Sequence, residues 1–324
     1  MKDLRISSVL ILLTALAALA GCESGPVAER PLFRESPRSL DARLPEFQAA
    51  RAALPDRVID IARANIGQPY QIYLLGESPF ETIDKQPVYS LKKSDCVVFV
   101  EHTLAMAMSD TFPDFLRALQ RIRYHDGVIG VRTRNHFTES DWNVNNRWLV
   151  QEITSEIGCG QIKQYKQVVN RKAFFKKRYK IDVDVPKESD TENYVPYENI
   201  DEVKSQLRTG DVVNIVKGTS ATSAWAHHMG FVAVMPDGAV HIIHSTVPRV
   251  KEEPIDAYIA RNTRDNAKND AKGKPRHRGF KFFRLMDDPM ANLKAIDGAE
   301  APKVTIPAQS RISFEAYVER AMKR

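Results

Sequence analysis

A cysteine at the start of an apolar segment and a later group of histidines are the residues best suited to chemistry. Cys96 directly follows Asp95 and opens a largely apolar run. The histidines come far downstream: His227, His228, His241 and His244. A thiolate is a nucleophile, but it needs a base, usually histidine, which in turn needs an orienting partner. This order predicts nucleophilic cysteine catalysis, and the alternative for Cys96 alone is an ordinary buried cysteine.

A helix is expected to begin at Cys96 and to cover residues 96–108. Ser94 and Asp95 favour the N-cap position, because their side chains accept hydrogen bonds from the first backbone N–H groups. Apolar residues then recur on one helical face: Val97, Val100, Leu104 and Met108. The free N–H groups and the dipole of a helix N-terminus favour a thiolate, so this helix is expected to lower the pKa of Cys96.

The histidines lie in predicted β-strands. Strand-like runs begin at Asp211, His228 and Ala239, and another lies near residue 280. Successive side chains point to opposite faces, so we expect His227 to face away from His228. For the same reason only one of His241 and His244 can face His228. Helices followed by antiparallel strands indicate an α+β fold.

The other segments complete this pattern. A helix is predicted over residues 47–65, ended by Gly67-Gln68-Pro69-Tyr70, and another over residues 113–124. Residues 125–150 are expected to form a loop rich in polar and aromatic side chains. Residues 261–278 are basic and polar, which predicts a solvated loop.

The first 22 residues are typical of an export signal. A short basic region precedes an apolar run over residues 6–20, which is too short to span a bilayer, since a spanning helix needs about 20 residues. The ending Leu19-Ala20-Gly21-Cys22 resembles a bacterial lipoprotein signal, in which lipid is attached to Cys22; the alternative is an ordinary secretory signal. Glu23 follows in place of the aspartate of inner-membrane retention. We therefore expect a periplasm-facing protein of the bacterial cell envelope, held at the outer rather than the inner membrane.

The chain divides into four predicted parts. Residues 1–22 are the signal with its lipobox, and the polar, Pro-rich residues 23–45 are expected to be a flexible tether. Residues 46–288 are expected to form one domain, followed by a C-terminal tail with a short helix at 289–324. With 324 residues, 43% hydrophobic and 27% charged, the chain can bury a core of its own.

The net charge and the cysteine content limit the classes of partner and cofactor that are expected. A net charge of +6 suits acidic envelope partners, although it is also common on a merely solvated surface. Nucleic acid is not expected as a partner of an exported protein. Of the three cysteines, Cys159 is expected to be a free thiol. No metal or other cofactor is expected, because His136 and Asp141 lack a tight cluster of further ligands.

Five short motifs occur in the order found in the NlpC-type cell-wall cysteine hydrolases. They are Gly67-Gln68-Pro69-Tyr70, Asp95-Cys96, Gly210-Asp211-Val212-Val213, His228-Met229-Gly230-Phe231 and His244-Ser245. The resemblance implies a papain-like fold, in which a central helix carries the nucleophile and packs on an antiparallel sheet. The stretch from Asp95 to Glu101 is similar to the D-C-x-x-F-V-E of the N-acetylmuramoyl-L-alanine amidase-like family. So is the loop with Gly130, Arg134, His136 and Asp141-Trp142, whereas Val97-Val98 departs from the Ser-Gly of the stem-peptide cutters.

The resemblance also implies roles. Cys96 would be the nucleophile, His228 the base, and His244 its orienting partner, with His241 as the competitor for that last role. The backbone N–H of Cys96 and the side chain of Tyr70 would bind the oxyanion. Four residues of the 125–150 loop would contact substrate: Arg134, His136, Asp141 and Trp142. From the residue types alone, Tyr70 and Trp142 can equally be packed aromatics and Asp141 a cap.

The function expected from these features is that of a cysteine amidase acting on peptidoglycan or muropeptides. It would cleave the N-acetylmuramoyl-L-alanine amide through a thioester, while the lipid on Cys22 holds it at a membrane. Three alternatives stay open: an endopeptidase acting within the stem peptide, a non-catalytic peptidoglycan-binding lipoprotein, and an acyltransferase of the wider papain-like superfamily.

Overall fold

The computed structural model describes residues 30–158, 160–220 and 222–323. The predicted export signal, the lipidation of Cys22 and the free thiol of Cys159 fall outside these ranges. The first half of the described chain contains nine helical segments: η1 (Leu32–Arg34), α1 (Pro37–Ala50), α2 (Leu54–Ala64), α3 (Cys96–Ala107), α4 (Phe112–Arg123), η2 (His125–Gly127), η3 (Thr138–Trp142), α5 (Asn143–Asn145) and α6 (Thr154–Gly158). The later ones are α7 (Arg171–Tyr179), η4 (Tyr197–Asn199), α8 (Ile200–Val203), η5 (Lys204–Gln206), α9 (Ile255–Asp270), α10 (Pro289–Asp297) and α11 (Phe314–Met322). In the described part of the chain no helix has the length and apolarity to cross a membrane.

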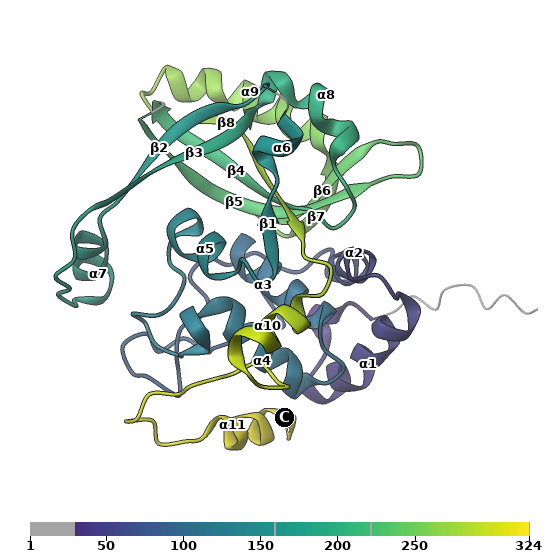
Figure 1. The fold of residues 1–324 in the computed structure, drawn as a ribbon, viewed down its shortest axis with the longest axis vertical. Coiled ribbons are helices and arrows are strands. Elements are labelled where there is room, and N and C mark those ends of the chain that lie inside the picture. The colour runs from purple at the N-terminus through teal and green to yellow at the C-terminus, as the bar shows by residue number, and fades with distance from the viewer. Residues whose placement is uncertain (1–29, 159, 221, 324) are drawn as a thin grey trace, which may run out of the picture.

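One antiparallel sheet organises the molecule (Figure 1). Its strand order is β2-β3-β8-β4-β5-β6-β7, with β1 paired to β8. The strands are β1 (Val150–Glu152), β2 (Lys163–Val169), β3 (Glu188–Pro196), β4 (Val212–Ser220), β5 (Ser223–Val234), β6 (Val240–Ser245), β7 (Val250–Pro254) and β8 (Arg276–Leu285). Helices α1 to α4 lie on one side of the sheet, and α8 and α9 lie on the other. The predicted α+β class is therefore confirmed.

Helix α3 is the centre of the larger core. Its residues from Val98 to Ala107 are all buried, and Phe99 packs edge-on against Phe231 of β5, with 5.8 Å between ring centroids. Its N-cap is Asp95, whose carboxylate accepts a hydrogen bond from the N–H of Val98 at 2.9 Å. The predicted helix at residues 96–108 is thus confirmed within one residue, because its cap and its apolar pattern are both local signals.

The predicted tether is wrong from Leu32 onward. Ser36 and Ser39 form a reciprocal capping box at the start of α1, and Leu40 and Leu44, one turn apart, are both 0% exposed in the main core. Four prolines make residues 23–45 look like a linker, but Pro37 occupies the first helical turn, where a missing N–H costs nothing. The helix predicted over residues 47–65 is in fact the end of α1 and the whole of α2.

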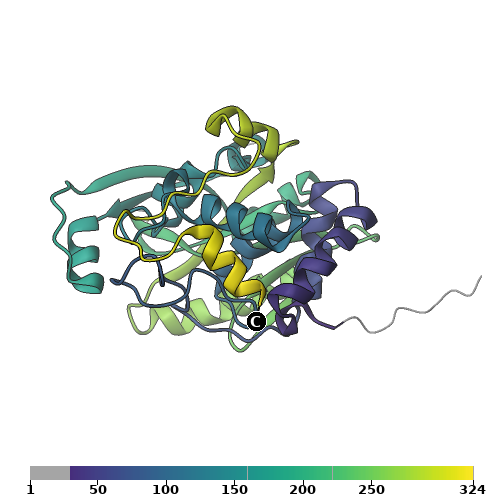
Figure 2. The same cartoon turned by 90° about the horizontal axis from the view of Figure 1, so that it is seen from below.

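The C-terminal boundaries also differ from the prediction. Residues 261–270 belong to α9 rather than to a solvated loop, because Tyr258, Asn262 and Asn266 place one face of this polar helix against the sheet. The tail is not separate from the domain at residue 288. Phe314 and Val318 of α11 join the same core as α3, and Figure 2 shows the tail running back across the N-terminal helices.

Candidate active site

Cys96 is the first residue of α3, and the segment before it is tied to the end of β6. The Oγ of Ser94 lies 2.6 Å from Oε1 of Gln68, and the Oγ of Ser245 donates to the carbonyl oxygen of Ser94 at 3.1 Å. All three of these polar side chains are buried. Because Ser245 directly follows His244, these bonds fix the start of α3 beside that histidine.

The turn at residues 67–70 brings Tyr70 to the same place. The N–H of Gly67 donates to the carbonyl of Val250, and the N–H of Tyr70 donates to that of Pro248, both at 2.9 Å. Burial, together with the neighbouring Cys96, raises the pKa of Tyr70 to about 12. The phenol therefore stays protonated and is able to donate a hydrogen bond near the thiol.

Two imidazoles and a carboxylate form a hydrogen-bonded chain at this site. The Nε2 of His228 lies 2.7 Å from Nδ1 of His244, and the Nε2 of His244 lies 2.8 Å from Oε1 of Glu253. Arg261 and Lys251 each contact the same Glu253 oxygen at 2.9 Å. The sequence predicted the pairing of the two histidines but not Glu253, which lies on β7, a strand that the sequence did not predict.

The carboxylate of Glu253 determines which nitrogens of His244 and His228 carry a proton. Although burial acts in the opposite sense, hydrogen bonds from His244, Arg261 and Lys251 hold the pKa of Glu253 well below its usual value. A carboxylate only accepts, so His244 donates to it from Nε2 and accepts from the Nε2–H of His228 through Nδ1. The Nδ1 of His228 is then unprotonated. Burial and the neighbouring His244 keep the pKa of His228 well below 6.5, so its imidazole is a neutral base.

The site lies where β5 and β6 separate. Their ladder ends at Phe231, while α3 packs on one face of the sheet and His244 contacts Tyr258 of α9 on the other, with 5.5 Å between ring centroids. Cys96 packs here against the core that contains Met229 of β5. Cys96 thus lies on the α3 face of the sheet, at the opening between β5 and β6. His228 and His244 lie on the α9 face, on the other side of this opening.

A β-bulge in β5 sets the direction of His228. Consecutive residues of β4 pair with His228 and Ala226, which leaves His227 as an extra residue. The prediction that His227 faces away from His228 is therefore wrong. The two rings lie 6.0 Å apart and nearly parallel, and the Nε2 of His227 is 3.3 Å from Nδ1 of His277. A strict two-residue alternation does not hold across a bulge.

The resting state of Cys96 also differs from the prediction. Burial, followed by the negative charge of Asp95, raises the pKa of the Cys96 thiol to about 12, while the backbone N–H groups of Met229, Val97 and Cys96 act in the opposite direction. The helix N-terminus therefore lowers the pKa as expected, but by less than burial and Asp95 raise it. The thiol is protonated at neutral pH, so it could act as a nucleophile only if a base removed its proton.

His241 is not part of the hydrogen-bonded series His228–His244–Glu253. Its Nδ1 is 3.3 Å from Glu252, and Glu252 forms a bidentate ion pair with Arg63 of α2. His241 and His244 thus occupy opposite faces of β6, and it is His244 that meets His228. Among the residues that the structure describes, no group of three or more His, Cys, Asp or Glu side chains is placed to hold a metal ion.

Arg134 is occupied within the protein. One terminal nitrogen donates to the carbonyl of Leu75 at 2.7 Å, and the other lies 2.9 Å from Asp84 and 2.7 Å from the hydroxyl of Tyr179. Its Nε lies 3.2 Å from the fully buried Glu77. The geometry therefore does not support the predicted grip on a substrate carboxylate, and Arg134 instead joins the 75–84 loop to α7.

The other loop residues are also held by their surroundings. Asp141 accepts from the N–H groups of His136 and Phe137, both at 2.9 Å, and Trp142 is only 1% exposed in the core. Trp142 is thus the packed aromatic that the sequence left open, and its predicted substrate contact is wrong for this reason. Asp141 does not cap the next turn, since it binds N–H groups of residues that precede it and neither η3 nor α5 has a side-chain cap. His136 has its Nε2 2.6 Å from the carbonyl of Val131 and borders a cavity beside β5.

Comparison with known proteins identifies a family whose model matches this chain. A model of the N-acetylmuramoyl-L-alanine amidase-like family matches residues 60–265, a range that contains Cys96, His228, His244 and Glu253. No curated protein matches the chain in sequence.

Two solved structures share the fold. A protein from Legionella pneumophila is 19% identical, covers 76% of this chain and 95% of its own, and has a TM-score of 0.63. An N-acetylmuramoyl-L-alanine amidase from Bacteroides uniformis is also 19% identical, covers 72% of this chain and 99% of its own, and has a TM-score of 0.55. At this identity the likeness concerns the fold.

Proposed function

The chain belongs to the N-acetylmuramoyl-L-alanine amidase-like family, and on this basis we propose that it is a peptidoglycan amidase of the papain-like NlpC type. Cys96 attacks the amide that joins the muramoyl lactyl group to L-alanine. The observation that carries the proposal is the hydrogen-bonded chain from His228 through His244 to Glu253, beside a thiol at a helix N-terminus. A neutral base next to a protonated thiol is suited to amide cleavage.

The acylation step follows from the tautomers. Nδ1 of His228 takes the thiol proton while the sulfur of Cys96 attacks the lactyl carbonyl carbon. The backbone N–H of Cys96 and the hydroxyl of Tyr70 donate to the oxyanion. The C–N bond then breaks, the proton on His228 passes to the alanine nitrogen, and the stem peptide leaves with a free amine.

Deacylation restores the enzyme. His228, again neutral, takes a proton from water, whose oxygen attacks the thioester carbonyl carbon. The C–S bond breaks, the thiol regains its proton from His228, and the muramoyl lactyl carboxylic acid is released. Throughout, the Glu253 carboxylate stabilises the positive charge that forms on the two imidazoles.

The test uses a defined disaccharide tetrapeptide in water enriched in oxygen-18, with products followed by mass spectrometry. We expect a free tetrapeptide with an N-terminal alanine and one heavy oxygen in the sugar lactyl carboxylate. The Cys96→Ala variant should give neither product. Cleavage inside the stem peptide would instead identify an endopeptidase. Absence of any product from intact or anhydro-muropeptides would favour a binding protein, and full activity of Cys96→Ala would overturn the mechanism.

We further propose that lipid on Cys22 holds the enzyme at the periplasmic side of the outer membrane. The lipobox-like ending at Cys22 and the following Glu23 support this proposal. Cells that express the protein should incorporate labelled palmitate into it, and Cys22→Ser should abolish the labelling and release the protein from the outer-membrane fraction. Unchanged labelling in Cys22→Ser would contradict the anchor.

A further inference from the structure

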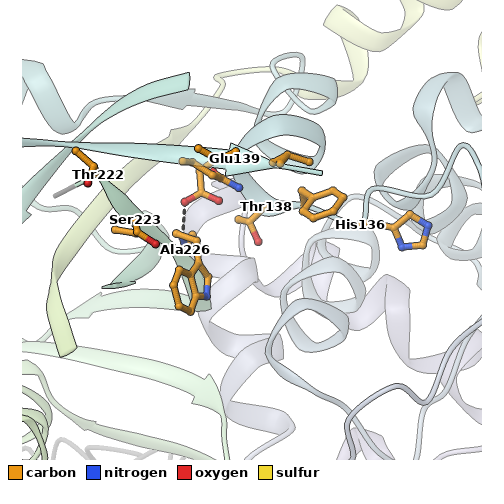
Figure 3. A pocket seen from close by; sticks show the side chains of 12 residues that line it. His136, Thr138, Glu139, Thr222, Ser223 and Ala226 are labelled. Atoms are coloured by element: carbon orange, nitrogen blue, oxygen red, sulfur yellow. Dashed lines mark hydrogen bonds between the residues drawn. The ribbon is translucent and has the colours of Figure 1, made fainter. Parts of the chain in front are cut away.

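A cavity of about 310 Å³ lies beside β5, between η3 and β2 (Figure 3). We call it the β5-edge cavity. Its walls include Thr138 and Glu139 of η3, Gln167 of β2, and residues 223–226 of β5. A volume of this size is at the lower end of the range for small-molecule sites, so it suits one compact ring rather than a long peptide.

The cavity and the nucleophile lie along the same strand. The backbone N–H of Ala226 donates to Oε1 of Glu139 in the cavity, and three residues further along Met229 belongs to the core against which Cys96 packs, where α3 contacts β5. Three strand residues span about 10 Å. Among the described residues, β6 pairs with β5 only from Phe231 onward, so the edge of β5 that faces β6 is unpaired between Ala226 and Phe231.

The walls offer acceptors and one aromatic face. The second carboxyl oxygen of Glu139 and the amide oxygen of Gln167 are buried and have no hydrogen-bond partner, although Tyr165 donates to the first Glu139 oxygen at 2.6 Å. Burial raises the pKa of Glu139, which suits a neutral ligand better than a charged amine. Trp225 is 37% exposed, an unusual exposure for a large apolar ring.

We propose that the β5-edge cavity is a subsite for the N-acetylated amino sugar on the acyl side of the scissile amide. The pyranose ring lies against Trp225, and its hydroxyl groups bond to Glu139 and Gln167. An amphipathic ring with neutral hydroxyl groups matches an aromatic face flanked by buried acceptors. This inference rests on the proposed function, since it names the part of the muropeptide that the cavity holds.

The kinetic test compares two substrates in the full protein: a muropeptide with its sugar, and the same stem peptide carrying only a lactyl group. The wild type should prefer the sugar-bearing substrate by at least about tenfold in kcat/KM, equivalent to about 1.4 kcal/mol. Trp225→Ala should remove most of this preference, and Trp225→Phe, which keeps a ring, should restore it. Ile296→Ala, which truncates an exposed apolar residue elsewhere, should not change it. An equal preference in wild type and Trp225→Ala would overturn the inference.

A binding test separates this inference from the proposed function. In Cys96→Ala, titration with N-acetylmuramic acid should change tryptophan fluorescence, and Trp225→Phe should remove the change, because Trp142 and Trp148 are buried. A fluorescence change produced by the free stem peptide but not by the sugar would overturn the sugar assignment. If the wild type hydrolyses neither substrate while the sugar still binds, the proposed function fails and the subsite stands. Thermal melting of each variant distinguishes lost binding from lost folding.

Discussion

The imidazoles of His228 and His244 are joined by a 2.7 Å hydrogen bond across the gap between β5 and β6. The second nitrogen of His244 is held in turn by Glu253 of the next strand. A negative charge therefore stands two hydrogen bonds away from the imidazole that we propose receives the thiol proton. Such preorganised charge stabilises an imidazolium without any rearrangement at the moment of reaction.

The two histidines of β6 should differ sharply when substituted. His244→Ala removes the acceptor for the Nε2–H of His228, and we expect kcat to fall by about 10²- to 10⁴-fold. His241→Ala removes one of the two partners of Glu252, which keeps Arg63, and should leave kcat within about twofold, since His241 lies outside the hydrogen-bonded series. Steady-state kinetics on a muropeptide measures both. Equal losses in the two variants would place the orienting role elsewhere.

Adjacent glutamates on β7 provide a matched pair. Glu253→Gln keeps an acceptor for His244 but removes the charge, so kcat should fall by about 10- to 100-fold. Because the carboxylate raises the pKa of His228, the acid limb of the pH profile should also move to lower pH. Glu252→Gln, which loses the pair with Arg63, should show neither effect. A fall in activity without any movement of the acid limb would indicate that Glu253 acts only on packing.

The pH dependence follows from the base. The pKa of His228 lies well below 6.5 in the folded protein, and that of the Cys96 thiol is raised to about 12. We expect kcat/KM to stay level from neutral into alkaline pH and to fall only below pH 6.5. Unfolded His228 binds a proton that the folded form resists, so the free energy of unfolding should also decrease as the pH falls below 6.5. A half-point of the acid limb above 6.5 would contradict the neutral base.

Arg134 should matter for stability. Arg134→Leu leaves Glu77 and Asp84 without their shared cation, and breaking a buried ion pair in this way costs about 3–5 kcal/mol. The loss should grow with pH, because burial already raises the pKa of Glu77 to about 7 and ionisation without Arg134 becomes harder still. Urea unfolding measures it, with the exposed Arg132→Leu as the control, expected within about 0.5 kcal/mol. A stable Arg134→Leu protein with a raised KM would return Arg134 to substrate binding.

The first helix offers a direct test of the N-terminal boundary. Leu44→Ala should lower the free energy of unfolding by about 2–5 kcal/mol, because Leu44 is fully buried. Glu46→Ala, exposed on the same helix, should change it by less than about 0.5 kcal/mol. Both substitutions would be silent if residues 37–45 were a tether.

Local signals were sufficient for the elements that hold Cys96 and the histidines. The cap at Asp95 and the apolar face after it predict α3 because a helix is read from neighbours within four residues. Likewise, residues of opposite parity on β6 separate His241 from His244 without any knowledge of tertiary contacts. The family resemblance then joined these elements in the correct order.

The features that could not be predicted from the sequence depend on contacts between residues that are not neighbours in the chain. Glu253 reaches His244 diagonally across the β6–β7 ladder, and nothing in its neighbourhood distinguishes it from other acidic residues until that register is known. The same holds for Arg134, whose partners, the buried Glu77 and the half-buried Asp84, lie some fifty positions earlier. A guanidinium in a polar loop reads as a substrate contact until these carboxylates fold against it.

The extra residue in β5 separates two tasks that one strand performs. Ahead of His227, side chains line the β5-edge cavity. Beyond it, the alternation is reset and His228 meets His244. Residues 222–226 can therefore change to suit a different ligand without altering the orientation of the imidazole. Loss of residue 227 would make this part of β5 regular, because Ala226 and His228 already pair with consecutive residues of β4, and His228 would keep its face of the sheet.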